Sequence, residues 1–411
     1  MYITESDWCC FMDLPVAALN IGLVSIMDLL VNLVAVKYFN FNAVELGLLN
    51  ALWTLVFIPV VKIMDRLADA GKVRLLWYIG SSSMALLQAL MYFSMILYSK
   101  QLIYVTYMVH TLVFASTRLA VNTYIFETRD SDSWNKASIM VSRLRLLSES
   151  VIIVSLALVG FSTIVTSGYM YLAILFTLLH FSGLLVIHEP RLKIERVLYR
   201  LESMLGKIFI PVKGLLTLSY LEINGSIPLS TRIYASALVP SGLIFLALVG
   251  FRLGNEYLWT PLPYYLTQVL RLGINDVLMV YGLGRLTAFA LYIAIRSSLV
   301  FKKSSFAAGI LVRLLVLMIL VNVKSSILIG FLLGLIYLAN DIIDSNLFLA
   351  FAKNRGGYGV GLYSLIGETI SLIGSASSGY LYAVGGPSLI TVLTTMLSIL
   401  VIPVVLKSRG E

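Results

Sequence analysis

The sequence predicts an all-α integral membrane protein with twelve transmembrane helices in two pseudo-symmetric bundles of six. The first observation is composition: 59% of the 411 residues are hydrophobic, 12% are charged, and the mean hydropathy is +0.93. Soluble domains carry about 25% charged residues, so this is not the composition of a soluble fold. The second is that the apolar runs are about 20 residues long, which suits membrane helices rather than barrel strands. The third is one long polar connection that leaves six runs on each side.

Twelve apolar runs are long enough to cross a bilayer as helices. They lie at about 14–38, 44–64, 75–98, 102–126, 136–160, 166–188, 236–268, 274–299, 304–323, 325–351, 358–382 and 386–406. The seventh is longer than a plain span needs and contains Trp259–Thr260–Pro261–Leu262–Pro263. Because proline removes a backbone donor and clashes with the preceding turn, we expect this run to break in its outer half.

The long connection divides the chain into three parts. Residues 1–190 are expected to form an N-terminal six-helix lobe, residues 191–235 a cytoplasmic linker, and residues 236–411 a C-terminal six-helix lobe. Apolar residues recur at helical spacing in the linker, with charged residues on the other face, so we expect an amphipathic helix on the membrane surface. The apolar positions are Leu192, Val197, Leu198, Leu201, Leu205 and Ile208.

The two halves show weak internal similarity. Similar residues recur at similar separations, which favours a duplicated six-helix unit. The pairs are Ser148–Glu149–Ser150 with Gly367–Glu368–Thr369, Asn122 with Asn340, and Glu45 with Asp276.

The distribution of Lys and Arg predicts the orientation. With the N-terminus inside, the cytoplasmic connections are strongly basic, whereas the outer ones hold only Lys37, Lys100, Arg271 and Lys324. Positive loops stay in the cytoplasm, so we expect a multi-pass protein of the cell membrane with both termini cytoplasmic. The acidic N-terminal segment is the one part that does not support this orientation. It also lacks Lys and Arg, so no cleavable signal peptide is expected.

Several classes of function find no support in the sequence. The net charge of +9 is explained by the basic cytoplasmic loops, so we expect no nucleic-acid partner. The adjacent Cys9 and Cys10 and the scattered His110, His180 and His188 lack metal-ligand spacing, so neither a metal nor a cofactor is expected. No GxxxxGK[ST] motif is present, which leaves ATP-driven transport unsupported.

The connection between the second and third runs is short, charged and mostly basic. Its residues are Asp65, Arg66, Asp69, Gly71, Lys72 and Arg74. Together with twelve spans, the six-plus-six division and the long central loop, it resembles the major facilitator superfamily over nearly the whole chain. The family's signature there is a Gly, an Asp–Arg pair, a second Gly and a basic cluster. Val61 stands in place of the first Gly, and the Asp-to-Gly spacing also departs from the family pattern.

This resemblance implies alternating access between two six-helix lobes, with the basic loop as a cytoplasmic gating element. The glycine–proline motif of the family's antiporters is not present in the fifth run, SRLRLLSESVIIVSLALVGF, which disfavours a drug/proton antiporter.

Ionisable side chains at membrane depth mark function by default, because burying them there is costly. Six bases and six acids lie at such depth: Asp28, Arg118, Arg143, Arg145, Glu149, Arg252, Glu256, Arg285, Arg313, Asp341, Asp344 and Glu368. Two pairs, Arg145 with Glu149 and Arg252 with Glu256, are four residues apart. Such pairs can neutralise each other on one helix and be purely structural. Arg143 is expected to snorkel toward the cytoplasmic end.

Asp28 has no basic residue within one helical turn and lies near mid-membrane, roughly 21 Å into its span at 1.5 Å per residue. Asn32 lies one turn further along the same helix. In the resembled family, spans one, four, seven and ten line the central cavity, which would let Asp28 face Arg118. We therefore consider an Asp28–Arg118 pair that protonation or substrate breaks and re-forms; a static pair and separate orientations are the alternatives.

Asp341 and Asp344 share one helical face, which suits proton carriage, although Arg285 or Arg313 could equally keep both ionised. Glu368 could pair with either arginine and is more easily read as structural.

The sequence thus predicts a secondary active transporter of a small polar solute. We expect proton coupling, in the form of a symporter, and a monomer that is not an enzyme. The alternatives are a multi-spanning transferase acting on a lipid or nucleotide-linked substrate, and a non-transporting receptor on the same scaffold. Asp65 and Asp69 could suit a metal site of such a transferase, but the surrounding Lys and Arg oppose a divalent cation.

Overall fold

The computed structural model describes residues 5–128, 131–189, 241–295, 297–300, 302–354 and 360–407. All the regular structure in these ranges is helical, which confirms the all-α prediction. The predicted linker, 191–235, lies outside the described residues.

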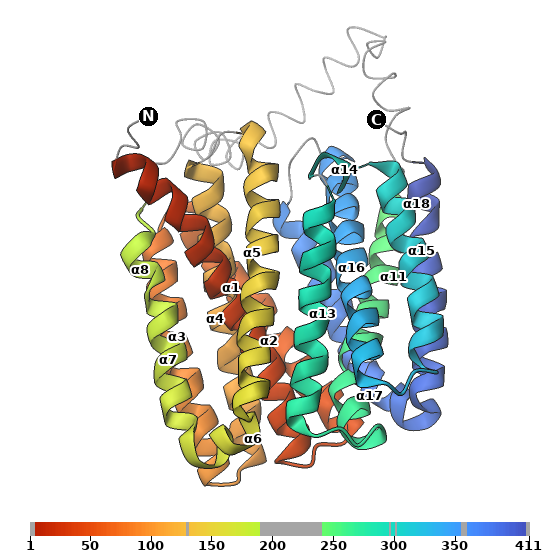
Figure 1. The fold of residues 1–411 in the computed structure, drawn as a ribbon. Helices are drawn as coiled ribbons and strands as arrows, with labels where there is room; N and C mark the ends of the chain where they lie inside the picture. Colours follow the sequence, from red (N-terminus) through yellow and green to blue (C-terminus); the bar gives the residue numbers. More distant parts are fainter. Residues whose placement is uncertain are drawn as a thin grey trace, which may run out of the picture.

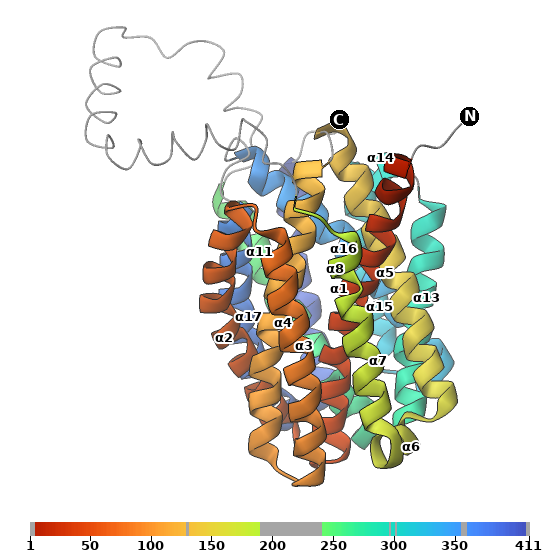
Figure 2. The same ribbon diagram turned by 90° about the vertical axis from the view of Figure 1, so that its left-hand side faces the viewer.

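The N-terminal half forms one bundle. Its helices are α1 (Glu5–Lys37), α2 (Ala43–Asp69), α3 (Val73–Ile96), α4 (Lys100–Thr128), α5 (Ser131–Val159), α6 (Phe161–Thr163), η1 (Ile164–Gly168), α7 (Tyr169–Phe181) and α8 (Gly183–Val186). The segment from α6 to α8 corresponds to the predicted sixth span, with a π-helical turn at η1. In Figure 2, α3 and α7 lie on the side of this bundle that faces away from the C-terminal half.

The C-terminal half forms a second bundle beside the first (Figure 1). Its helices are α11 (Ser241–Trp259), α12 (Leu262–Tyr264), η2 (Tyr265–Val269), α13 (Ile274–Ala294), α14 (Ser297–Val300), α15 (Lys303–Leu320), α16 (Ser326–Asn354), α17 (Val360–Ile399) and α18 (Ile402–Lys407). The break expected at Trp259–Pro263 is confirmed, because α11 ends at Trp259 and a short helix and a π-helical turn follow. α17 contains a kink at Gly386, whose φ of 63° is not helical.

Nine helical runs in the described residues are long and apolar enough to cross a membrane. One of them, Tyr363–Lys407, contains the kink at Gly386 and covers the last two predicted spans. The more polar α5 and α11 lie in the bundles with the nine and cover two further predicted spans. The membrane-helix prediction is thus confirmed, although the nine runs supported by length and hydropathy cover ten of the twelve predicted spans.

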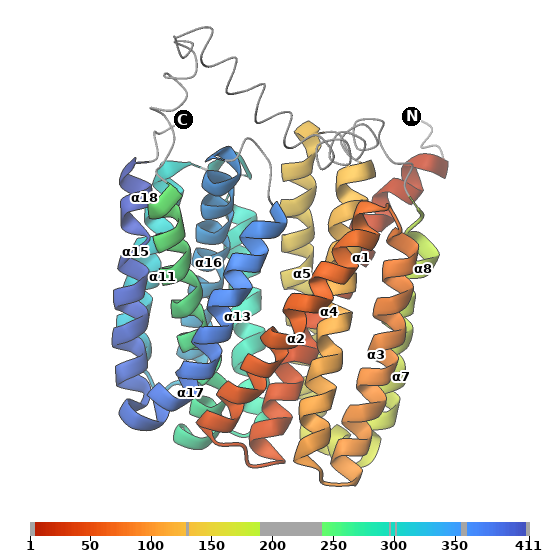
Figure 3. The ribbon, with the colours of Figure 1, turned by 180° about the vertical axis from the view of Figure 1, so that it is seen from behind.

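Both ends of the described chain lie at one end of the molecule, which we call the termini end; the opposite end is the far end (Figure 1). The two lobes meet along two helix pairs, α2 with α17 and α5 with α13. Figure 3 shows α2 and α17 converging at the far end and separating toward the termini end.

Matching caps begin α2 and α13. Asn42 accepts a hydrogen bond from the Glu45 backbone, and the Glu45 carboxylate accepts one from the Asn42 backbone. In α13 the Asp276 carboxylate accepts from the Gly273 backbone nitrogen at 3.2 Å. Carboxylates at this position satisfy free amide groups and complement the helix dipole. The sequence correspondence between Glu45 and Asp276 therefore has a shared structural cause.

The second and third spans join at a tight turn. α2 continues to Asp69, so Asp65 and Arg66 are helical rather than in the loop predicted from the sequence. Gly71 has a φ of 69°, a conformation that glycine adopts without the penalty a side chain would bring.

Candidate functional site

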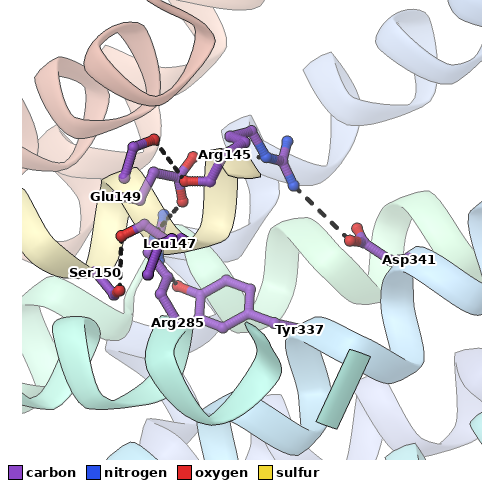
Figure 4. A network of polar contacts seen from close by, with 8 residues as sticks. Arg145, Leu147, Glu149, Ser150, Arg285, Tyr337 and Asp341 are labelled. Atoms are coloured by element: carbon purple, nitrogen blue, oxygen red, sulfur yellow. Dashed lines mark hydrogen bonds and ion pairs between the residues drawn. The ribbon is translucent and has the colours of Figure 1, made fainter. Parts of the chain in front are cut away.

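A network of ion pairs joins α5 of the N-terminal lobe to α13 and α16 of the C-terminal lobe (Figure 4). Glu149 of α5 accepts a hydrogen bond from Nε of Arg285 on α13. Arg145, one turn before Glu149, lies 3.7 Å from the Glu149 carboxylate and 3.8 Å from Oδ2 of Asp341 on α16. We call Arg145, Glu149, Arg285 and Asp341 the inter-lobe ion network.

The Glu149–Arg285 pair is the buried part of this network. Glu149 is 2% exposed and Arg285 is 9% exposed. Arg285 also donates to the Tyr337 hydroxyl and lies over the Tyr337 ring, which stacks on Trp259 with centroids 4.6 Å apart. Removing one member of a buried pair leaves an uncompensated charge, which typically costs about 3–5 kcal/mol. The pair therefore acts as a strong link between the lobes.

A second ion pair lies within the C-terminal lobe. Arg252 of α11 is 3.0 Å from Oδ1 of Asp344 on α16, and the Tyr363 hydroxyl donates to the same oxygen at 2.7 Å. Asp341 and Asp344 are thus each paired, but with Arg145 and Arg252. The arginines considered for this role from the sequence, Arg285 and Arg313, form no ion pair with them in the described residues.

Asp28 lies in a cluster of neutral hydrogen-bonding groups, which we call the Asp28 cluster: Asp28, Asn32, Asn50 and Tyr107. The Tyr107 hydroxyl donates to Asp28 and accepts from Nδ2 of Asn32 at 3.0 Å. It also lies 2.9 Å from Oδ1 of Asn50 on α2. A phenol has one proton to donate, so Tyr107 can serve Asp28 or Asn50 but not both.

Two aromatic side chains, Trp53 and His110, lie beside the Asp28 cluster. Trp53 Nε1 donates to Nδ1 of His110 at 2.8 Å, and Nε2 of His110 lies 2.9 Å from the Val24 carbonyl. The carbonyl can only accept, so His110 is neutral and carries its proton on Nε2. Tyr107 and His110 stack with centroids 5.7 Å apart. The imidazole is thus held in one tautomer.

The hypothesised Asp28–Arg118 pair is not present in this conformation. Asp28 is held by Tyr107, and Arg118 lies eleven residues further along α4, about 16 Å at 1.5 Å per residue. The Arg118 guanidinium instead lies over the Phe114 ring at 5.7 Å, and the side chain is exposed. The structure thus corresponds to the alternative in which the two groups are apart.

Glu256 of α11 is held by hydroxyl groups alone. Thr260 donates to its Oε2 at 3.1 Å. Oγ of Ser375 on α17 lies 2.8 Å from the same oxygen and 2.8 Å from the Ser371 carbonyl oxygen, so its one proton can serve either acceptor. The local Arg252–Glu256 pair considered from the sequence does not form, because Arg252 is turned toward Asp344. In the described part of the chain, Glu256 has no ion-pair partner, and the same is true of Asp28.

Glu368 and Arg118 lie on opposite lobes and are not in direct contact. Neither forms an ion pair or a hydrogen bond within the described residues, but each lies within electrostatic range of the other. The suggested pairing of Glu368 with Arg313 or Arg285 is therefore wrong for this conformation. Arg143 bridges the lobes at the termini end by donating to the Ile295 carbonyl at 2.7 Å, rather than simply snorkelling.

The predicted gating residues lie away from these groups. Asp65, Arg66 and Asp69 occupy the last turns of α2, while Gly71, Lys72 and Arg74 form the turn and the start of α3 at the termini end. The described ranges contain no group of three His, Cys, Asp or Glu side chains that could hold a metal ion. A groove of about 390 Å³ between α3 and α7 is also remote, and its lining is almost wholly apolar.

Sequence reasoning missed the uncharged members of the site. Tyr107 contacts both Asp28 and Asn50. Tyr337 accepts a hydrogen bond from Arg285. The Tyr363 hydroxyl contacts Asp344, and the Ser375 hydroxyl contacts Glu256. One signal was available. Tyr107, His110, Phe114 and Arg118 recur at intervals of three and four residues, which places them along one face of α4.

Sequence comparison gives no relative: no family model and no curated protein matches the chain. Solved structures do match it over nearly its whole length. A structure concerned with substrate recognition in proton-dependent oligopeptide transporters is 13% identical, with a TM-score of 0.67 and 97% of each chain covered. The xylose transporter XylE from E. coli, in an inward-open conformation, is 9% identical, with a TM-score of 0.61 and 94% of each chain covered.

The chain adopts the major facilitator fold. This confirms the resemblance found in the sequence, and the coverage shows that both lobes take part. Both of these matching structures are of transporters. At these identities the likeness establishes the major facilitator fold and not the solute.

Proposed function

We propose that this protein is a secondary transporter that moves a small polar solute by alternating access of its two major-facilitator lobes, with proton coupling. Residues 1–190 and 236–411 are the two moving units in this proposal, and residues 191–235 connect them. The termini end is assigned to the cytoplasm of a cell membrane because the basic connections cluster there. The working unit is a monomer, since a single chain supplies both lobes.

Asp28 and Glu256 are proposed as the proton-carrying groups. Each is a carboxylate at membrane depth whose partners in the described structure are neutral donors. A carboxylate that no cation stabilises takes up a proton more readily than one held in an ion pair. Asp341, Asp344 and Glu149, in contrast, each have an arginine beside them.

The single observation that carries the proposal is that both groups are linked to the same closed contact. At the far end α2 and α17 touch so closely that a Cβ on Gly47 would lie 2.8 Å from the Ser375 carbonyl oxygen. Glu256 holds the Ser375 hydroxyl on α17, and Asp28 acts through Tyr107 on Asn50 of α2. Protons on these two carboxyl groups can therefore alter both helices of one contact.

The expected sequence of events follows from hydrogen-bond chemistry. A proton on Asp28 removes its need for the Tyr107 proton, which then becomes free for Oδ1 of Asn50. A proton on Glu256 weakens its acceptance of the Ser375 hydroxyl. The α2–α17 contact loosens and the far end opens, while the lobes close at the termini end. Release of the protons restores the present arrangement.

The charges between the lobes favour a solute with both a negative and a positive group. Arg118 on the N-terminal lobe offers a guanidinium and Glu368 on the C-terminal lobe offers a carboxylate, and neither forms an ion pair in the described residues. A dipolar solute between them would satisfy both charges. The oligopeptide transporters among the matching structures give an independent reason to test short peptides and amino acids.

The test is uptake into proteoliposomes that contain the purified full-length protein. Sugars, organic acids, amino acids, short peptides and cationic drugs would be supplied with and without an inward proton gradient. We expect gradient-driven accumulation of at least one dipolar solute. Uptake that ignores the gradient would reject proton coupling, and no uptake of any solute would count against transport. Metal-dependent turnover of a nucleotide-linked substrate would favour the transferase instead.

Variants of the two carboxylates localise the coupling. Asp28→Asn and Glu256→Gln should abolish accumulation against a gradient while leaving downhill exchange of the solute measurable. Asp276→Asn is the matched control, because it removes the same charge from a helix cap at the far end. Coupled uptake that survives in both test variants would exclude Asp28 and Glu256 as the carriers.

A further inference from the structure

A groove runs between α3 and α7, on the side of the N-terminal lobe that faces away from the C-terminal lobe (Figure 2). Its volume is about 390 Å³, and its lining is almost wholly apolar. Both helices belong to runs that are long and apolar enough to cross a membrane, so this side of the lobe faces hydrocarbon rather than water. None of the residues assigned to the transport cycle lines the groove.

The groove exists because small side chains occupy successive turns of both helices. Ala85 and Ala89 of α3 are four residues apart and therefore share one face, and Ala173 and Thr177 of α7 have the same spacing. An occupant of the groove therefore lies close to the two helix backbones. Larger apolar side chains complete the lining and are exposed at the surface: Phe93, Met170, Ile174 and Leu178.

The groove lies in one half of the membrane. α3 runs from Val73 at the termini end to Ile96 at the far end, and its lining residues, from Ala85 to Phe93, fall in the second half of the helix. This stretch is about 12 Å long at 1.5 Å per residue, and the α7 lining, 170–178, has the same length. One leaflet contributes about 15 Å of a hydrocarbon core that is about 30 Å thick. The groove therefore matches an acyl chain of the far-end leaflet in length and direction.

The amide of Gln88, which lies in the lining, does not oppose an apolar occupant. Gln88 is 2% exposed, and the Tyr169 hydroxyl donates to its Oε1 at 2.5 Å. Its Nε2 lies 3.1 Å from Sδ of Met27 on α1. Hydrocarbon against an amide without partners would be costly. Because the polar atoms of Gln88 contact neighbouring protein groups, the groove accepts a hydrocarbon chain without that cost.

We propose that this groove holds one acyl chain of a phospholipid from the far-end leaflet, independently of the proposed transport function. The groove is continuous with exposed apolar residues such as Leu86 and Leu175, which belong to the surface that faces the bilayer. A volume of about 390 Å³ over about 12 Å gives a cross-section of roughly 30 Å², well below that of a helix 10–12 Å in diameter. The occupant is therefore a chain rather than a helix of a second copy. Van der Waals packing holds it, because the chain leaves surroundings that are equally apolar.

The test is photocrosslinking of the full-length protein in vesicles of phosphatidylcholine that carries a diazirine in the middle of one acyl chain. After irradiation, the adducts are mapped by mass spectrometry of peptides. We expect several-fold more adducts on 85–93 and 170–178 than on α15, where Leu315 and Met318 are exposed in the same half of the membrane. Equal adduct density on the two surfaces would overturn the proposal, because it would show general contact with lipid only.

Two variants fill the groove from opposite walls. Ala89→Phe on α3 and Ala173→Phe on α7 should each lower the groove adducts several-fold and leave those on α15 unchanged. Ala308→Phe is the matched control, because it makes the same change at an exposed position of α15. Groove adducts that persist in both filled variants would overturn the proposal. So would a wild-type dimer, measured by light scattering, that Ala89→Phe dissociates, because a second copy would then occupy the groove. The wild-type comparison decides even where a variant fails to fold.

Discussion

The two contacts between the lobes are related by the internal repeat, yet they are built from different chemistry. The α5–α13 contact is held by charge, with Glu149 joined to Arg285. The α2–α17 contact is held by shape: a Cβ on Gly379 would lie 2.2 Å from the Ala43 carbonyl oxygen. An ion pair can persist when the angle between its two helices changes. Close backbone packing at a glycine, in contrast, is lost when the two helices separate.

The internal repeat shows which corresponding residues differ between the two contacts. α13 and α2 both begin with a capping acid, and nine residues later α13 has Arg285 where α2 has Thr54. Glu368 in α17 corresponds to Glu149 in α5 but forms no ion pair in the described residues. One copy of the unit therefore carries a charged link between the lobes, while the corresponding carboxylate of the other copy does not.

The largest effect is expected from breaking the charged contact. Glu149→Gln leaves Arg285 without a carboxylate and should lower the free energy of unfolding by about 3–5 kcal/mol. Arg285→Gln should cost less, because Arg145 still lies 3.7 Å from the Glu149 carboxylate. The double variant Glu149→Leu with Arg285→Met removes both charges and should recover much of that loss. Thermal unfolding in detergent measures it. Losses that simply add in the double variant would show that the two residues do not act as a pair.

The next effect concerns the contact held by shape. Gly379→Val places side-chain atoms against the backbone of α2, and overpacking of this kind typically costs about 1–3 kcal/mol. The population with a closed far end should fall by about tenfold or more, and uptake should fall with it. Gly242→Val is the control, because no atom of the described residues lies within 4 Å of a Cβ at Gly242. Equal uptake by both variants would show that close approach at Gly379 is not needed.

The smallest effect compares the two capping acids. Glu45 also pairs with Lys100 at 2.7 Å, with both side chains partly exposed, and such pairs contribute up to about 1 kcal/mol. Glu45→Gln should therefore destabilise the protein slightly more than Asp276→Asn, whose amide oxygen can still accept from Gly273. High salt should remove most of the difference in melting temperature. A larger loss in Asp276→Asn would contradict this account of the caps.

Features that depend on local chemistry were predictable from the sequence. Hydropathy located the helices, the prolines after Trp259 located the break, and Gly71 located a tight turn. The extension of α2 through Asp65 was missed, because charged residues end an apolar run without ending the helix. The residue at which a helix ends can therefore lie beyond the residue at which its apolar run ends.

The pairing of the charges was not predictable in the same way. Periodicity tells which residues share a face of one helix, but not which neighbouring helix that face meets. Arg252 therefore seemed suited to Glu256 one turn away, although it pairs with Asp344 on α16. Neutral groups such as Tyr107 carry no signal in a search for charges, even though Tyr107 decides the surroundings of Asp28.

The central claim is that protons on Asp28 and Glu256 control the α2–α17 contact. Spin-label distances test it after Cys9 and Cys10 are replaced by serine. Leu48 and Val384 mark the far end of the two helices, and Ile63 and Leu365 mark the termini end; all four side chains are exposed.

Acidification of the reconstituted protein should lengthen the Leu48–Val384 distance and shorten the Ile63–Leu365 distance. The double variant Asp28→Asn with Glu256→Gln should show the acid distances at every pH. Distances that do not respond to pH, or a double variant that still follows the wild type, would contradict the account.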